Sequence, residues 1–411
     1  MSAAGGSLGA GRRRLSAALV ATSVLAVGAA GTASAAPAPG QTCAPAANTP
    51  YRKVSWAQRR LDPARVWMLT RGGGVTVAVL DTGVSRSAPA LRGRVLRGKD
   101  VLTGGRADDD CDGHGTFVAG LVAARPVGGG ATFTGIAPDA RILPVRVGER
   151  SEDVHPDMLA KGIDAAVAGG AGVIAVVSTA PFGSAALSRA VARAVRTAVV
   201  VGAATTERNQ RGDGAFPGAL PGVLAVMPIG PQGLLPNLRP SVQPSLCAPS
   251  MELVGIGRSG SGNLLGSGPN LAVGYVAGTA ALVRAYLPRA GVADVRDRVA
   301  TNTDPVGGPD PDPVLGRGVL DPVAAVTAVM PAASERTVVP PAEDLTVPRP
   351  AAVDTRATDT VLRWTMLVLG VAIVVLLVGS AWVRARRRGW STAPAISESD
   401  THAADSSPSR A

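Results

Sequence analysis

The residue best suited to chemistry is His114, one of only three histidines in the chain. It stands between two glycines in the stretch D-G-H-G-T, which is followed by the small apolar run F-V-A-G-L-V. The run predicts a buried helix that begins near the histidine, and the flanking glycines let other backbone approach the ring closely. An imidazole in this place could accept a proton near neutral pH. A histidine that is only hydrogen-bonded in a loop fits the same residues equally well.

A carboxylate upstream in the sequence favours a chemical role for His114. Residues 75–84, V-T-V-A-V-L-D-T-G-V, predict a buried strand that ends at Asp81. Ligands of open α/β sheets bind at the carboxyl ends of the strands, so Asp81 is expected beside a site. A carboxylate there could hold the imidazole of His114 in one orientation.

Three motifs together resemble the subtilisin-like serine proteases: D-T-G at 81–83, H-G-T at 114–116 and G-Y-V-A-G-T-A-A-L-V at 274–283. The resemblance covers roughly residues 52–330, and the layout is most similar to the mycosins, membrane-anchored relatives in type VII secretion systems. It implies that the aspartate orients the histidine as general base for a serine nucleophile. It also implies that the segment after Ser178 lines a groove for extended peptide.

The nucleophile position departs from the family pattern G-T-S-x-A-A-P-x-V-A-G. Counting back from Gly278, the serine position holds Asn270, within G-P-N-L-A-V-G. A carboxamide cannot form an acyl-enzyme as an alkoxide does, and removing the serine from such a triad lowers turnover by about 10⁶. Asparagine is also a good helix N-cap, so we expect the fold to tolerate Asn270 at this position.

The oxyanion position departs as well. The register after the strand expected at 198–203 puts Thr206 where the family has an asparagine that donates to the oxyanion. Asn209 is a candidate only if an insertion shifts the register. Losing one such donor lowers turnover by about 10²–10³, and the hydroxyl of Thr206 could replace the donor in part.

Two classes of function remain open. The first is a non-hydrolytic component with an idle Asp81–His114 pair, which holds extended peptide in its cleft or supports a type VII secretion membrane complex. The second is a serine endopeptidase that processes secreted proteins with Ser267, three residues before Asn270, as a shifted nucleophile. The second needs another register at the helix start, with Pro269 moved out of the site, so we favour the first.

Apolar strands alternate with helices along the middle of the chain. Strands are expected at 140–147, 171–178 and 198–203, and helices at 157–168 and 185–196. Strands that are apolar throughout imply a parallel sheet covered by helices on both faces. We therefore expect an α/β fold with a doubly wound, mostly parallel sheet of the subtilisin type, together with one C-terminal transmembrane helix.

The chain has three cysteines. Mycosins tie their N-terminal extension to the loop before the active-site histidine, and this resemblance implies a disulfide between Cys43 and Cys111. Cys247 is then expected to be a buried free thiol. Three cysteines at these spacings do not suit a metal site.

An acidic run at residues 108–110, with Asp112 beyond it, has enough oxygen for a calcium ion. No spaced glutamate or carbonyl pattern accompanies the run, so a solvated loop is the preferred reading. No metal or cofactor is expected.

The ends of the chain predict export and anchoring. An arginine triplet, a long apolar stretch and A-S-A at 33–35 are typical of a secretory signal. Twenty uncharged residues at 364–383 are long enough to cross a bilayer, and the arginines that follow place the C-terminus in the cytoplasm. The expected organisation is a signal peptide at 1–35, an N-terminal extension at 36–51, a subtilisin-like domain at 52–330, a Pro-rich linker at 331–360, a transmembrane helix at 361–383 and a basic, disordered tail at 384–411.

The net charge of +11 rests almost wholly on arginine. A high net positive charge can indicate nucleic-acid binding. The sequence, however, has no basic helix with interleaved aromatic residues and no cysteines or histidines at the spacing of a zinc site. We therefore expect a membrane partner and no nucleic acid.

Overall fold

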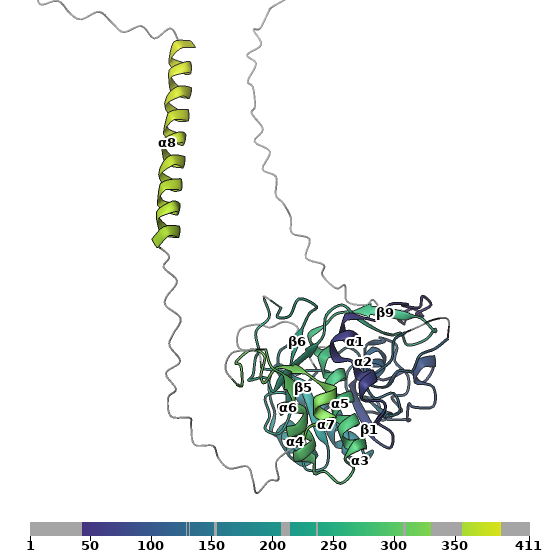
Figure 1. Cartoon of the computed structure of the whole chain (residues 1–411). Coiled ribbons are helices and arrows are strands. Elements are labelled where there is room, and N and C mark those ends of the chain that lie inside the picture. The colour runs from purple at the N-terminus through teal and green to yellow at the C-terminus, as the bar shows by residue number, and fades with distance from the viewer. Residues whose placement is uncertain are drawn as a thin grey trace, which may run out of the picture. The chain divides into compact units, whose positions relative to one another are not determined.

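The computed structural model describes residues 43–128, 130, 132–151, 154–206, 214–235, 237–306, 310–329 and 356–387. The chain divides into two compact units, residues 1–330 and 331–411 (Figure 1). The expected signal peptide and linker lie outside the described residues, except that the helix of the second unit begins at Arg356. Asn209 and the tail beyond 387 also lie outside them.

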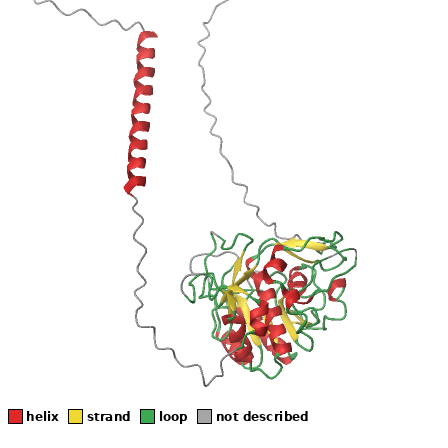
Figure 2. Ribbon diagram, viewed as in Figure 1, coloured by secondary structure: helices red, strands yellow, loops and turns green. Residues whose placement is uncertain are grey.

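In the described part of the first unit, nine strands form one sheet in the order β10-β11-β7-β6-β5-β4-β1-β3-β2. Figure 2 draws the strands in yellow and the helices in red. All neighbouring pairs are parallel except β10 and β11. The strands are β1 (Thr76–Asp81), β2 (Lys99–Asp100), β3 (Arg141–Arg146), β4 (Val173–Val176), β5 (Val199–Ala203), β6 (Leu224–Ile229), β7 (Leu246–Pro249), β10 (Thr303–Asp304) and β11 (Val319–Leu320). The expected parallel sheet is confirmed.

Two hydrophobic cores lie on opposite faces of this sheet because successive strand residues point to opposite sides. In β1, Val77 and Val79 belong to one core, and Ala78 and Leu80 belong to the other. The first core includes α2 (His114–Ala123), α5 (Ala272–Tyr286), α6 (Val292–Thr301) and α7 (Pro322–Thr327), and the second includes α3 (Pro156–Ala168) and α4 (Ala185–Ala194). Burial on both faces explains why the strands lack an alternating polar pattern.

Helices α2 and α5 pack closely in the first core. A side chain at Gly274 would place its Cβ 3.1 Å from Val118 and 3.2 Å from Leu121. Both distances are shorter than most Cβ contacts, so glycine suits this close approach. The contact fixes the first turn of α5 beside the helix that begins at His114.

Smaller elements complete the unit. They are α1 (Trp56–Leu61), η1 (Pro63–Arg65), η2 (Pro89–Leu91), η3 (Pro269–Leu271) and the antiparallel hairpin of β8 (Leu253–Ile256) and β9 (Asn263–Gly266). The hairpin lies on α2, because a Cβ at Gly255 or Gly266 would come within 2.7 Å of the Phe117 ring. The N-terminal segment runs along it: Ala47 N–H donates to Ser259 O, and Asn263 N–H donates to Thr49 O.

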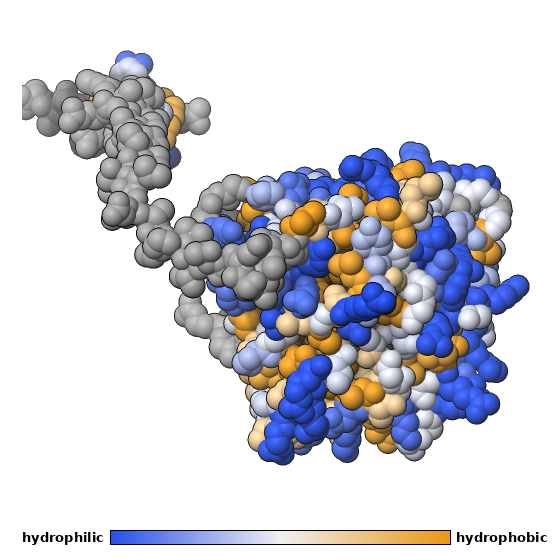
Figure 3. All heavy atoms as spheres, turned by 60° about the horizontal axis from the view of Figure 1, so that its bottom comes forward, coloured by the Kyte–Doolittle hydropathy of each residue, from blue (hydrophilic) through white to orange (hydrophobic). Residues whose placement is uncertain are grey.

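The second unit contains one described helix, α8 (Arg356–Arg387). Its stretch Thr365–Arg384 has a mean hydropathy of 2.7 and is long and apolar enough to cross a membrane. In the first unit, by contrast, polar and apolar side chains are interspersed over the face drawn in Figure 3.

Candidate active site

The carboxyl end of β1 brings the two chemical residues together. Asp81 is the last residue of the strand and is fully buried. Its Oδ2 lies 2.8 Å from Nδ1 of His114, and its Oδ1 accepts the Thr82 amide at 2.7 Å. Strand β1 lies between β3 and β4, where the order of the sheet reverses. Such a switch point is where open α/β sheets place their sites. A carboxylate on Nδ1 leaves Nε2 to serve as a base.

Glycines allow this approach. A Cβ at Gly115 would lie 2.1 Å from the carbonyl oxygen of Gly83 and 3.1 Å from Cβ of Asp81. Gly113, just before the helix, has a φ of 91°, a conformation that favours glycine. The H-G-T spacing therefore lets the first turn of α2 lie directly on the end of β1.

A third carboxylate, Asp110, ties the two motifs together. Its Oδ1 accepts hydrogen bonds from the Thr82 hydroxyl (2.9 Å) and the Gly113 amide (2.8 Å). Its Oδ2 accepts from the amide (2.8 Å) and hydroxyl (2.6 Å) of Thr116. Burial raises the pKa of Asp110, and the hydrogen bonds from Gly113 and Thr116 oppose the rise. The preference for a solvated loop is wrong at this residue, which is fully buried.

Sequence reasoning did not assign a role to Asp110. The available signal was the pair of threonines in D-T-G and H-G-T, since both hydroxyls donate to this one carboxylate. Asp110 therefore positions the loop before the histidine. Among the described residues, no group of three or more His, Cys, Asp or Glu could hold a metal ion.

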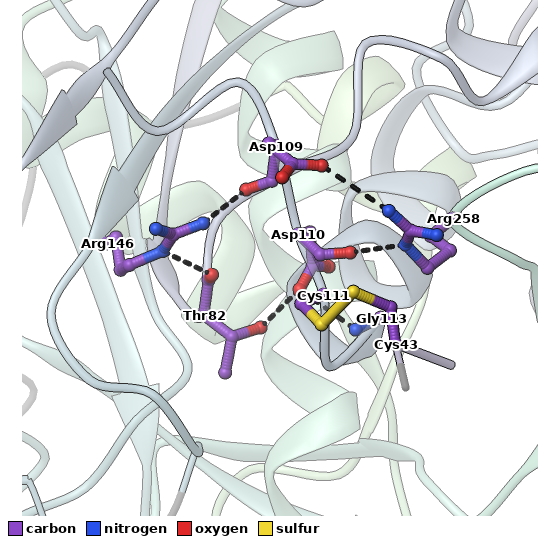
Figure 4. The surroundings of a disulfide bond; sticks show 8 residues. All are labelled: Cys43, Thr82, Asp109, Asp110, Cys111, Gly113, Arg146 and Arg258. Carbon is purple, nitrogen blue, oxygen red and sulfur yellow. Dashed lines mark hydrogen bonds and ion pairs between the residues drawn. A yellow bond between two sulfur atoms is a disulfide. The ribbon is translucent and has the colours of Figure 1, made fainter. Parts of the chain in front are cut away.

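The disulfide between Cys43 and Cys111 is present, as expected (Figure 4). Two guanidinium groups flank the adjoining acidic loop on opposite sides in the same view. Arg146 donates to the carbonyl oxygens of Thr82 (2.8 Å) and Asp109 (2.7 Å). Arg258 donates to the carbonyl oxygen of Asp110 (2.8 Å) and lies 3.5 Å from the Asp109 carboxylate. The loop is thus held by arginines and a crosslink.

Asn270 lies in η3, directly before α5, and only 1% of it is exposed. Helix η3 packs against β5 and β6. Within the described residues, neither Oδ1 nor Nδ2 of Asn270 has a hydrogen-bond partner. The N-cap of α5 is Leu271, with no side-chain hydrogen bond. Asn270 therefore does not use its N-cap preference at α5, because the short 3-10 turn intervenes and buries the amide.

The other family positions lie at neighbouring strand ends. Thr206 follows β5 and is buried, with 7% exposed. Ser178 follows β4 and is fully buried, and its hydroxyl has no hydrogen-bond partner among the described residues. Asp81 thus ends β1, and Ser178 and Thr206 come after the ends of β4 and β5. These three strands are adjacent in the sheet.

Ser267 lies elsewhere. It is exposed, it follows β9, and its Oγ accepts the Glu252 amide at 2.9 Å. It lines a pocket of about 430 Å³ together with Tyr51, Trp56 and Glu252. Neither Asp81 nor His114 lines this pocket. In the described part of the chain, no hydrogen bond joins Ser267 to His114.

Cys247 is a buried free thiol, as expected, and burial raises its pKa to about 12. The thiolate is the form that reacts. Relative to an ordinary pKa of 9.0, a pKa of about 12 lowers the thiolate fraction at pH 8 roughly 10³-fold. Iodoacetamide should therefore alkylate the native chain at least that much more slowly than the chain in guanidinium, as followed by mass spectrometry. Equal rates would contradict the burial.

Comparisons with known proteins agree with the subtilisin-like fold and site described above. The subtilase family model (Peptidase_S8) matches residues 72–318. Mycosin-4 of Mycobacterium tuberculosis is 33% identical over 64% of this chain and 67% of its own length. Mycosin-1 of the same organism is 31% identical over 67% of this chain and 74% of its own length.

Solved structures agree. MycP1, described as a serine protease and an essential component of the type VII (ESX-1) secretion system, superposes with a TM-score of 0.59 at 30% identity, over 70% of this chain and 93% of that one. A chain of the periplasmic assembly from the ESX-5 inner membrane complex gives a TM-score of 0.61 at 26% identity, over 76% and 94%. The chain therefore belongs to the subtilase family, as a relative of the mycosins.

Proposed function

We propose that this chain is a mycosin-like subtilase that does not hydrolyse peptide bonds and serves as a structural or peptide-binding component of a type VII secretion complex. One observation carries the proposal: counting back from Gly278 in the family pattern puts Asn270 at the nucleophile position, and Asn270 is only 1% exposed. A carboxamide cannot attack a peptide carbonyl and form an acyl-enzyme.

The remaining geometry fits an idle site. The 2.8 Å contact between Asp81 and His114 would orient a base. Position 270 has no hydroxyl group from which the imidazole of His114 could remove a proton. Thr206, at the family's oxyanion position, offers a hydroxyl in place of a carboxamide donor, which by itself lowers turnover by about 10²–10³.

Membrane anchoring is part of the proposal. Helix α8 supplies a span of sufficient length and hydropathy. The basic residues after it favour a cytoplasmic C-terminus, and the arginine-led apolar stretch at the other end favours export of the domain. The disulfide supports an oxidising compartment outside the cytoplasm.

Association with a secretion complex rests on the relatives. MycP1 and the ESX-5 assembly tie proteins of this fold to type VII secretion. A member without a nucleophile could keep such a structural role, since assembly depends on surfaces and anchoring. Copurification of the membrane-extracted chain with the other components of the secretion machinery is the expected result.

Labelling with a fluorophosphonate probe tests the lack of hydrolysis. The purified full chain should remain unlabelled, while an active subtilisin in the same mixture is labelled. A Ser267→Ala variant is the matched control, because Ser267 is the exposed serine nearest in sequence to position 270. Labelling of the wild type that disappears in Ser267→Ala would overturn the proposal and identify an active peptidase.

A further inference from the structure

A second pocket lies at the amino-terminal ends of the central strands, and Asp81 lies at the carboxyl end of β1. It has a volume of about 330 Å³. It is lined by the first residues of two strands, Thr76 of β1 and Arg141 of β3, and by Gly172, which precedes β4. Arg284, in the last turn of α5, also lines it. The carboxyl end of β1, with the candidate active site, lies at the other end of the same strand. The pocket is therefore separate from that site.

The pocket contains two guanidinium groups and no carboxylate. Arg141 and Arg284 are its only charged lining residues. Neither makes an ion pair with any residue that the structure describes. Nη1 of Arg284 is buried and has no hydrogen-bond partner within the same described set. Arg284 as a whole is partly buried, and burial lowers the pKa of its guanidinium group.

The carboxylate of Asp139, close to the pocket, already pairs with other arginines. Cβ of Asp139 lies 4.0 Å from where a Cβ on Gly73 would stand, beside the pocket. Its carboxylate, however, pairs with three other arginines, which are Arg71, Arg94 and Arg125. The positive charge of the pocket is therefore not cancelled from this side.

Glycines keep the pocket open. Nothing lies within 4 Å of a Cβ built on Gly74 or Gly170, so these walls face empty space. A Cβ at Gly172 would stand 3.0 Å from Nε of Arg284. The guanidinium thus lies directly over backbone, and a larger residue at Gly172 would displace it.

We propose that this pocket binds a phosphate group. Arginine presents a planar fork of N–H donors that matches phosphate oxygens, and the bonds are strengthened by charge. Arg284 supplies one cation from α5, and Arg141 supplies a second from the start of β3. The phosphate can come from free phosphate or from the phosphodiester of a phospholipid head group.

Thermal unfolding of the full chain in an uncharged detergent tests the proposal. Inorganic phosphate is titrated against potassium chloride at matched ionic strength, with wild type, Arg141→Gln, Arg284→Gln and Arg289→Gln. Arg289 is the matched control, because it is exposed, lies in sequence between two lining residues and does not line the pocket. A ligand at a hundredfold excess over its Kd should raise the midpoint of wild type and Arg289→Gln by roughly 5–10 °C.

The variants of the lining arginines should lose this rise. Should Arg284→Gln fail to fold, Arg141→Gln alone still decides the question. Equal shifts in all folded variants would show a general salt effect and overturn the proposal, and so would the absence of any shift. A parallel titration with glycerophosphoglycerol, the water-soluble head group of phosphatidylglycerol, separates the two sources. A pocket-dependent shift with this diester alone indicates lipid, and one with inorganic phosphate alone indicates the free ion.

Discussion

Asn270→Ser is expected to turn a silent chain into a slow peptidase. Restoring the nucleophile recovers up to about 10⁶ in turnover in a subtilisin-type triad. Turnover should stay about 10²–10³ below the full gain, because Thr206 does not supply the amide donor to the oxyanion. We therefore expect Asn270→Ser to cleave a fluorogenic peptide about 10³–10⁴ times faster than the wild type. Serine is smaller than asparagine, so the buried pocket at η3 can accept it without displacing β5 or β6.

A second substitution and two controls sharpen this test. Adding Thr206→Asn should raise turnover by a further factor of about 10²–10³, because it returns an amide donor to the oxyanion. Placing His114→Ala in the double variant should abolish the gain, since the 2.8 Å contact with Asp81 makes that imidazole the base. Ser267→Ala in the same background should leave turnover unchanged. A folded double variant as inactive as the wild type would show that the missing hydroxyl is not the decisive loss.

Asp81 and His114 could be predicted from the sequence because their placement follows from local rules. An apolar run of strand length ends at the aspartate, and a glycine-flanked histidine begins an apolar helix. The parallel sheet brings the end of β1 beside the start of α2. The alternation of apolar strands and helices likewise predicted both covered faces of the sheet, and strand ends differ from expectation by only one or two residues.

Asp110 and Asn270 show where such reasoning stops. Four aspartates within five residues look solvated, and only the tertiary arrangement shows that Asp110 is enclosed by two threonines and a backbone amide. Asparagine before a helix suggests a cap, but the cap depends on where the helix begins. A 3-10 turn at η3 moves the start of α5 to Ala272 and leaves the amide of Asn270 buried.

The proposed loss of the nucleophile is compatible with an intact scaffold for a physical reason. The contacts that place the site are Gly115 against Gly83 and Gly274 against Val118, together with the Asp110 network. None of them uses the side chain at position 270. Chemistry at this site can therefore be lost by one substitution while the fold persists.

Breaking the disulfide is expected to have the largest effect on stability. The bond between Cys43 and Cys111 closes a loop with a sequence separation of 68. In the chain-entropy model a loop of this size contributes about 4 kcal/mol to the free energy of unfolding, because the crosslink restricts the unfolded chain. A Cys43→Ala/Cys111→Ala variant should therefore melt roughly 10 °C below the wild type when unfolding is followed by circular dichroism.

The third cysteine provides the control. Cys247→Ala also removes a buried sulfur but no crosslink, so it should cost only about 1 kcal/mol. Adding a reductant should lower the melting point of the wild type toward that of the double variant and leave the double variant unchanged. If oxidised wild type and double variant melt together, the crosslink contributes little. The N-terminal segment is then held by its backbone bonds to Ser259 and Asn263, and by the bond from the Ala44 amide to Cys111 O.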